Sequence, residues 1–157
     1  MRLLETAPSP IPKLREFVGS QIPPYAILSH TWGDDEVTLQ QLLANTVDPT
    51  PLQPKAGFHK IQRTCALAQA HNLEYAWVDT CCIDKTSSAE LTEAINSMFA
   101  WYRDAAVCYV FLDDLRPGAA GDLLHTLPKC RWFTRGWTLQ EMIAPREALF
   151  FDKECKQ

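Results

Sequence analysis

Four short apolar runs alternate along the chain with segments of helical periodicity. The apolar runs are residues 25–30, 74–83, 106–115 and 147–152. Each run is short, almost continuously apolar and bounded by turn residues, which is the pattern of a strand buried inside a parallel sheet. The sequence therefore predicts four central strands.

The segments between these runs carry the periodicity of helices. Apolar residues recur at three- and four-residue spacing from Phe58 to Asn72. Asn72 itself is a residue that suits a helix C-terminal cap. Ser87 and Glu90 form a capping-box pattern, which marks the start of another helix. The sequence predicts helices at 58–72, 87–104 and 135–142, with a shorter helix beginning near Thr38.

This alternation of strands and helices predicts an α/β fold. We expect a doubly wound, mainly parallel sheet with helices on both faces, because right-handed strand–helix–strand units pack in that way. Such sheets bind ligands beyond the carboxyl ends of their strands, so residues that directly follow strands are the candidate functional residues. Residues 1–24 are rich in proline and predict an irregular segment before a domain at 25–157. The last predicted strand lies close to residue 157, so we expect a domain truncated at its C-terminal side, from a longer protein.

The composition narrows the classes of function. The 157 residues suit one domain, and a net charge of −4 offers no general attraction for nucleic acid or for an anionic membrane. No apolar stretch is long enough to span a bilayer, and no secretory signal is present, so we expect a cytoplasmic protein with reduced thiols. The six cysteines show no metal-binding spacing, and no glycine-rich phosphate loop occurs. We therefore predict no metal and no bound cofactor.

A carboxylate near the C-terminus has two interpretations. Trp137 and Glu141 share one face of the predicted helix, and Trp137 is expected to pack inward, which draws Glu141 toward a partly buried position. Burying an unpaired carboxylate costs several kcal/mol. Glu141 therefore either pairs with Arg131 or Arg135 in a structural role, or lies in a cleft with a raised pKa. The spacing alone leaves both interpretations open.

Other candidate residues follow the predicted strands. Asp79 either caps a turn or reaches into the cleft, and Trp32 either fills the core or stacks on a ligand. Cys81 or Cys82 is a candidate nucleophile, with His30 after a neighbouring strand. That chemistry requires the thiolate to lie within hydrogen-bonding reach of the histidine.

Three motifs, taken together, resemble the fungal heterokaryon-incompatibility (HET) domain. They are YAILSHTWG at 25–33, YAWVDTCCID at 75–84 and RWFTRGWTLQEMIAP at 131–145, and the resemblance extends over 25–152. Lys85 departs from the family pattern, which usually has glutamine there, so we assign it no role. The resemblance implies a programmed-cell-death effector of fungal innate immunity, also found as a module beside immune-receptor-like domains.

HET domains are distantly similar to Toll/interleukin-1 receptor (TIR) domains, which have a flavodoxin-like sheet. Several TIR domains hydrolyse NAD at the nicotinamide–ribose bond, using a glutamate commonly found within W-C-L-x-E. The sequence W-T-L-Q-E, from Trp137 to Glu141, occupies the corresponding place. The resemblance implies Glu141 as the catalytic residue and NAD as a substrate rather than a cofactor. From their positions near strand ends, we expect Ser29, Trp32, Asp79 and Trp137 to contact the substrate.

One carboxylate is enough for this reaction. Most glycosidases need an acid to protonate the leaving group, whereas nicotinamide is already cationic in NAD and leaves as a neutral molecule. An anionic Glu141 would then stabilise the positive charge that develops on the ribose. The alternative is a TIR-like module without enzymatic activity that signals cell death by homotypic assembly, with the apolar segment 132–142 as an interface.

Overall fold

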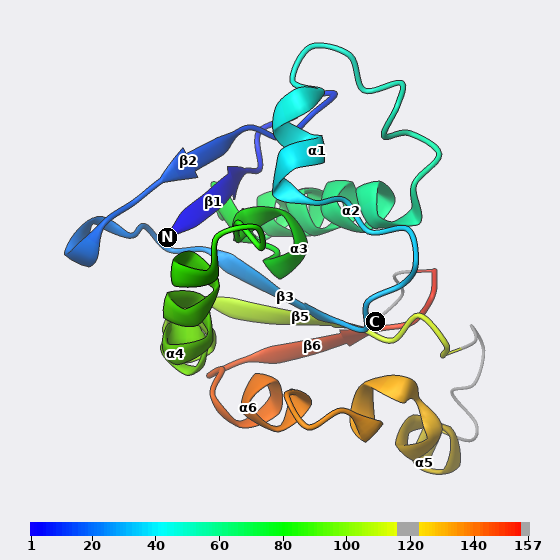
Figure 1. The fold of residues 1–157 in the computed structure, drawn as a ribbon. Helices are drawn as coiled ribbons and strands as arrows, with labels where there is room; N and C mark the ends of the chain where they lie inside the picture. The colour runs from blue at the N-terminus through cyan, green and yellow to red at the C-terminus, as the bar shows by residue number, and fades with distance from the viewer. Residues whose placement is uncertain (116–122, 155–157) are drawn as a thin grey trace.

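The computed structural model of this protein describes residues 1–115 and 123–154. These residues form a six-stranded sheet with the strand order β2-β1-β4-β3-β5-β6. The strands are β1 (Arg2–Glu5), β2 (Leu14–Glu16), β3 (Ala26–His30), β4 (Tyr75–Trp77), β5 (Val107–Phe111) and β6 (Ala148–Phe151). Strands β3, β5 and β6 cross the middle of the molecule, and β2 lies at its edge (Figure 1).

The centre of the sheet is parallel. Strand β3 pairs in parallel with β4 on one side and with β5 on the other, and β5 pairs in parallel with β6. Every residue of β3 and of β5 is buried, as their continuous apolar runs predict. The strands expected within 25–30, 106–115 and 147–152 are confirmed, and so is an α/β fold with a mainly parallel sheet.

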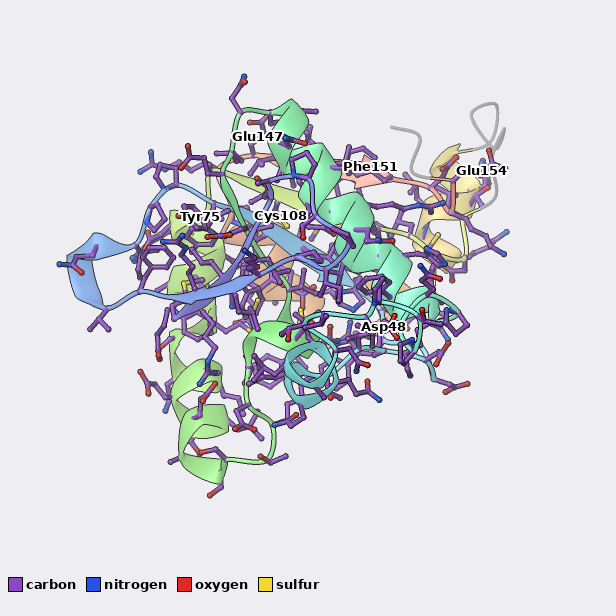
Figure 2. All side chains as sticks on the ribbon, turned by 90° about the horizontal axis from the view of Figure 1, so that it is seen from above. Asp48, Tyr75, Cys108, Glu147, Phe151 and Glu154 are labelled. Atoms are coloured by element: carbon purple, nitrogen blue, oxygen red, sulfur yellow. The ribbon has the colours of Figure 1, made fainter. Side chains whose placement is uncertain are left out.

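Helices cover both faces of this sheet. They are α1 (Leu39–Ala44), α2 (Ala56–Ala70), α3 (Asp79–Cys82), α4 (Ser88–Asp104), α5 (Leu123–Thr126) and α6 (Thr138–Ile143). Figure 1 shows α2 on one side of the sheet, with α4 and α6 on the other, and the view from above shows α2 crossing the strands (Figure 2). None of the helices in the described ranges has the length and apolarity that crossing a bilayer requires.

The connections around β3 determine where a ligand would bind. The chain passes from β3 to β4 through α2, and then returns to the other side of β3, to β5, through α4. This reversal of direction is a topological switch point, and such sheets bind ligands beyond the carboxyl ends of the strands that flank it. The carboxyl end of β3 is therefore the expected position of a site.

The helix boundaries follow the capping signals in the sequence. The hydroxyl of Ser87, the N-cap of α4, accepts a hydrogen bond from the Glu90 amide at 3.3 Å. Thr38 forms a complete capping box with Gln41 at the start of α1. Asn72, directly after the C-cap of α2, has a φ of 59°, the left-handed conformation that ends many helices.

The prediction of an irregular segment at 1–24 is wrong for part of that segment. Strands β1 and β2 pair with each other in antiparallel fashion, and β1 also pairs with β4, so this segment extends the sheet. Leu3 and Leu4 have no exposed surface. Strands of three or four residues are too short to show a clear period of two. The prolines of the neighbouring connections made the whole segment resemble a loop.

The strand predicted at 74–83 is too long. Strand β4 ends at Trp77, and residues 79–82 form the short helix α3, whose Cys81 and Cys82 are buried. A short apolar run that is buried on all sides has the same composition in a strand and in a helix, so periodicity cannot separate the two. The turn into α3 places Asp79 at its first position, close to the carboxyl end of β3.

Gly57 allows α2 to approach the loop that follows β3. The Gly57 amide donates a hydrogen bond to the Asp35 carbonyl at 3.1 Å. A Cβ atom on Gly57 would lie 2.6 Å from the Glu36 Cα and 2.8 Å from the Asp35 carbonyl oxygen. These contacts are with backbone atoms, so a side chain at this position would push the loop away from the helix.

We expect Gly57→Ala to lower the free energy of unfolding by about 1–3 kcal/mol, the usual cost of overpacking. The matched control is Gly136→Ala, because nothing lies within 4 Å of a Cβ at that position. Chemical denaturation of the two variants measures the difference. An equal effect of both substitutions would contradict the close approach.

Candidate active site

A cavity of about 270 Å³ lies at the expected edge of the sheet. Its polar lining consists of Asp79, Lys85, Arg135 and Glu141, and its aromatic lining of Trp32 and Trp137. Its apolar lining consists of Ile83 and of Leu91, Ile95 and Met98 of α4. The cavity therefore collects side chains from the loop after β3, from the α3–α4 segment and from α6, all far apart in the sequence.

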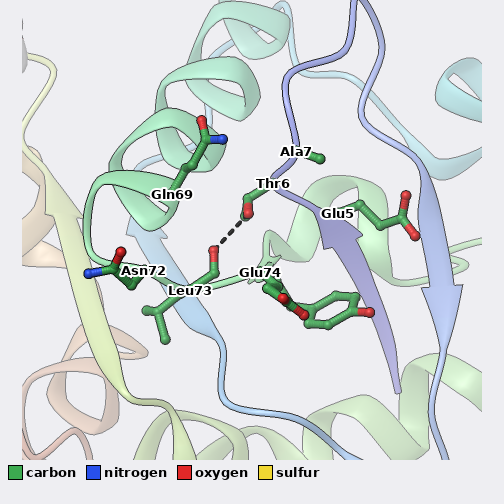
Figure 3. A pocket seen from close by; sticks show the side chains of 8 residues that line it. Glu5, Thr6, Ala7, Gln69, Asn72, Leu73 and Glu74 are labelled. Atoms are coloured by element: carbon green, nitrogen blue, oxygen red, sulfur yellow. Dashed lines mark hydrogen bonds between the residues drawn. The ribbon is translucent and has the colours of Figure 1, made fainter.

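A larger depression, of about 550 Å³, lies elsewhere, beside the start of β4 (Figure 3). Its lining includes Thr6, whose hydroxyl donates a hydrogen bond to the Leu73 carbonyl at 2.7 Å. It belongs to the amino end of a parallel strand, whereas ligands of such sheets bind at the carboxyl ends. We therefore take the smaller cavity as the candidate site.

A chain of three buried side chains ends at Glu141, which lines this cavity. The Trp132 indole Nε1–H donates a hydrogen bond to the Ser29 hydroxyl at 2.6 Å, and the Ser29 hydroxyl donates to the Glu141 carboxylate. Only 5% of Glu141 is exposed. Because an ionised carboxylate can only accept, the serine proton points toward the glutamate, while the serine oxygen accepts from the indole. Ser29, on the central strand β3, thus determines where the carboxylate lies.

Burial is the main influence on the proton affinity of Glu141. Removal from water raises the pKa of this carboxyl above its ordinary value of 4.5, because the charged form loses hydration. The hydrogen bond from Ser29 and the positive charge of Arg135 oppose that rise, and the negative charge of Asp79 adds to it. The upward shift of the pKa agrees with the cleft interpretation of Glu141.

The arginines expected as alternative partners of Glu141 bind elsewhere. The Arg131 guanidinium lies 3.4 Å from an Asp113 carboxylate oxygen, and Arg135 donates a hydrogen bond to the His30 carbonyl at 2.6 Å. Within residues 1–115 and 123–154, no lysine or arginine forms an ion pair with Glu141. Of the two interpretations drawn from the sequence, the arginine-paired carboxylate is wrong.

The rim of the cavity is formed by Trp32, Asp79 and Lys85. The Trp32 indole Nε1–H donates a hydrogen bond to Asp79 Oδ2 at 2.8 Å, and 47% of Trp32 is exposed. The Lys85 ammonium nitrogen lies 3.4 Å from the centroid of the Trp32 ring. Burial lowers the pKa of Lys85, and the negative charge of Asp79 opposes this change. Asp79 thus reaches the cavity and Trp32 lies outside the core.

His30 lies behind this rim, between two carboxylates. Its Nδ1 is 3.9 Å from Asp79 Oδ1, and its Nε2 is 3.7 Å from Glu36 Oε1. Burial alone would raise the pKa of Glu36, but His30, the Gly33 amide and Lys60 together lower it to about 2. The contacts from Asp79 through His30 and Glu36 to Lys60 connect the rim of the cavity to α2, which carries Lys60.

The comparisons with known proteins give the family. The family model described as heterokaryon incompatibility protein (HET) matches residues 25–129. This chain belongs to the HET family. It is also 48% identical, over 160 residues, to the vegetative incompatibility protein HET-E-1 of Podospora anserina. That alignment covers 98% of this chain but only 12% of the relative's length, and no solved structure matches.

The family match confirms the resemblance drawn from the three motifs, but it ends before α6. The role of Glu141 therefore depends on the W-T-L-Q-E motif and on the geometry of this HET domain, not on the family match. The similarity to TIR domains stays a prediction.

Trp137 differs from its expected position in the core. Half of its surface is exposed, and it lines the cavity at the N-cap of α6. Because α6 begins only at Thr138, the face that this helix buries carries Thr138 and Glu141. In this segment, the tryptophan that packs into the core is Trp132, which is 1% exposed. Trp132 lies in a 3-10 helix, where a 3.6-residue period does not apply.

The structure gives no support to a cysteine enzyme. Cys81 and Cys82 are both buried, and the Cys81 thiol faces the Val78 carbonyl at 3.8 Å. The neighbouring Cys82 thiol, together with burial, raises the pKa of Cys81 well above its ordinary value, so the reactive thiolate is disfavoured. The ring nitrogens of His30 face carboxylates instead. Among the described residues, no group of three His, Cys, Asp or Glu side chains is placed to hold a metal.

The sequence pattern did not indicate two side chains that the structure places at or beside this site, Lys85 and Trp132, and it indicated Arg135 only as a possible partner of Glu141. Each of the three lies inside one of the family motifs or directly after one. The sequence feature that could have indicated these side chains is their position next to the candidate residues of the motifs. Their directions depend on contacts with distant segments, which a local pattern does not contain.

Replacing Glu141 with glutamine should stabilise the protein at neutral pH. An acid with a raised pKa in the folded state binds its proton more tightly when folded, so its ionisation destabilises the fold as the pH rises above 4.5. Glutamine removes the charge and keeps an acceptor for Ser29. We expect a higher Tm at neutral pH, by about 2–4 °C per kcal/mol gained, with the difference shrinking toward pH 4.5.

The control is Glu93→Gln, which removes an exposed glutamate from α4. Thermal unfolding monitored by circular dichroism over a pH series measures both variants. A Tm that falls at neutral pH in Glu141→Gln, or that moves equally in both variants, would contradict the interpretation of Glu141 as a buried charge.

Proposed function

We propose that this HET domain is a cell-death effector of fungal heterokaryon incompatibility that hydrolyses NAD at the nicotinamide–ribose bond, with Glu141 as the catalytic carboxylate. The biological role is supported by the family and by the relative from Podospora anserina, which is a vegetative incompatibility protein. The observation that carries the chemistry is the buried Glu141, which lines a cavity and is held by a serine instead of an arginine.

The reaction needs stabilisation of positive charge more than proton transfer. The bond between C1′ of the ribose and the ring nitrogen breaks, and its electron pair stays with nicotinamide, which leaves as a neutral molecule. Water then adds to C1′ and releases a proton, which gives ADP-ribose. In a site shielded from water, an ionised Glu141 stabilises the intermediate cation more strongly than it would in bulk solvent.

The other residues of the site have roles that follow from their exposure. Trp32 and Trp137 present exposed aromatic surface at the cavity, against which a flat base packs. Asp79 lines the cavity, and we assign it the role of accepting hydrogen bonds from ribose hydroxyls. Ser29 has no exposed surface and is bonded to Trp132 and Glu141, so we assign it the positioning of Glu141 instead of the expected contact with substrate.

Purified protein at high concentration should release nicotinamide from NAD. We expect Glu141→Gln to lower the rate by about 100-fold or more, the loss typical of removing one electrostatic group from an active site, while Glu93→Gln keeps the wild-type rate. Because burial raises the pKa of Glu141, activity should fall with acidification at a pH above that of an ordinary carboxyl group. Equal turnover by wild type and Glu141→Gln would remove Glu141 from the mechanism.

A second candidate function, homotypic assembly, is favoured by the outer surface of α6. Leu139, Met142 and Ile143 are 61%, 46% and 61% exposed, and Phe99 of the neighbouring α4 is 45% exposed. Adjacent apolar side chains on neighbouring helices are a common feature of protein interfaces. We name Leu139, Met142, Ile143 and Phe99 the α6 patch.

Assembly through the α6 patch predicts that the Leu139→Glu/Ile143→Glu double variant stays monomeric at concentrations where the wild type associates. Sedimentation velocity measures this difference. If assembly alone signals, cell killing persists in Glu141→Gln and is lost in the double variant. Monomeric wild-type protein at high concentration would exclude this candidate.

A further inference from the structure

Lys85 occupies a position that is built for a cation. Its ammonium nitrogen lies over the face of Trp32, 3.4 Å from the ring centroid. The electron-rich face of an indole is the strongest aromatic partner of a cation. The ring cannot turn freely, because its N–H donates to Asp79 Oδ2 at 2.8 Å. The aromatic face and its orientation are therefore fixed around the charge that it holds.

The carboxylates of the cavity strengthen this preference. Asp79 and Glu141 both line it, and the second oxygen of Asp79, Oδ1, is buried without a hydrogen-bond partner among the described residues. Arg135 is the other cation of the lining, but its guanidinium is bonded to the His30 carbonyl. A cation that enters the cavity would thus meet an aromatic face and two carboxylates that, among the described residues, form no ion pair with a lysine or an arginine.

The Lys85 ammonium group is able to leave this position by rotation of its side chain, while the backbone of the turn stays in place. The Lys85 backbone lies in the turn between α3 and α4, held by Asp84, whose carboxylate accepts from the Thr86 amide at 2.9 Å. The Asp84 amide in turn donates to Glu90 at 2.7 Å. The flexible side chain of Lys85 is thus attached to a fixed backbone. Its partial burial, which lowers the pKa of the ammonium group, opposes the attraction of the aromatic face.

We infer that Lys85 is an intramolecular competitor for the cation site on Trp32, and that this site selects a flat organic cation of the pyridinium class. A ligand of this class displaces the ammonium group and stacks on the same ring beside Asp79 and Glu141. Lys85 then sets the affinity of the cavity and keeps it occupied when no ligand is present. The inference rests on the proposed function only for the identity of the natural ligand, the nicotinamide end of NAD.

The test measures binding of 1-methylnicotinamide, a pyridinium cation without phosphate, by calorimetry. We expect Lys85→Met and Lys85→Gln to bind it about fivefold more tightly than the wild type, since each variant removes a competing cation–π contact. Neutral nicotinamide should gain much less. Lys85→Arg keeps a cation on the ring and should match the wild type, as should Lys13→Met, which removes an exposed lysine outside the cavity.

Unchanged or weaker binding of 1-methylnicotinamide in both Lys85→Met and Lys85→Gln would overturn the inference, with circular dichroism confirming that the variants are folded. An equal gain for neutral nicotinamide would overturn the selection of a cation. The outcome is separate from the proposed function. Tighter cation binding in the Lys85 variants without any NAD hydrolysis supports the inference and contradicts the proposed enzymatic activity. NAD hydrolysis with unchanged cation affinity in these variants supports the enzymatic activity and contradicts the inference.

Discussion

The hydrogen-bond chain from Trp132 through Ser29 to Glu141 is the interaction on which the site depends. It joins the central strand to two segments more than 100 residues further along the chain. Each member is buried, so a missing partner would leave a polar group unsatisfied at a cost of about 1–3 kcal/mol, and more for the carboxylate. The same contacts that dock α6 against the sheet therefore also hold a carboxylate in the cavity.

A second set of polar contacts forms the rim, and it meets the first at the same edge of the sheet. Trp32 is bonded to Asp79, and His30 lies between Asp79 and Glu36, which pairs with Lys60 on α2. These contacts tie the loop after β3 to α2 and to α3. Gly57 makes the arrangement feasible, because any side chain there would meet the backbone of that loop.

The three motifs of the HET family converge on one cavity. The residues after β3 supply Trp32, the segment after β4 supplies Asp79, and the segment before β6 supplies Glu141. The reversal of chain direction around β3 brings these segments together, because it places the carboxyl ends of β4 and β5 on either side of β3.

The sequence by itself determined the elements whose signals are local. Short, continuous apolar runs identified β3, β5 and β6, and capping residues marked the starts of α1 and α4. It also singled out Glu141 and Asp79 by motif and by position at strand ends. Only the tertiary structure decided that β1 and β2 join the sheet, that residues 79–82 are helical, that Trp137 is exposed while Trp132 is buried, and that Lys85 lies on Trp32. The physical reason is that periodicity and capping act within a few residues, whereas strand partners, the buried side of a short helix and the direction of a polar side chain depend on segments far away in the chain.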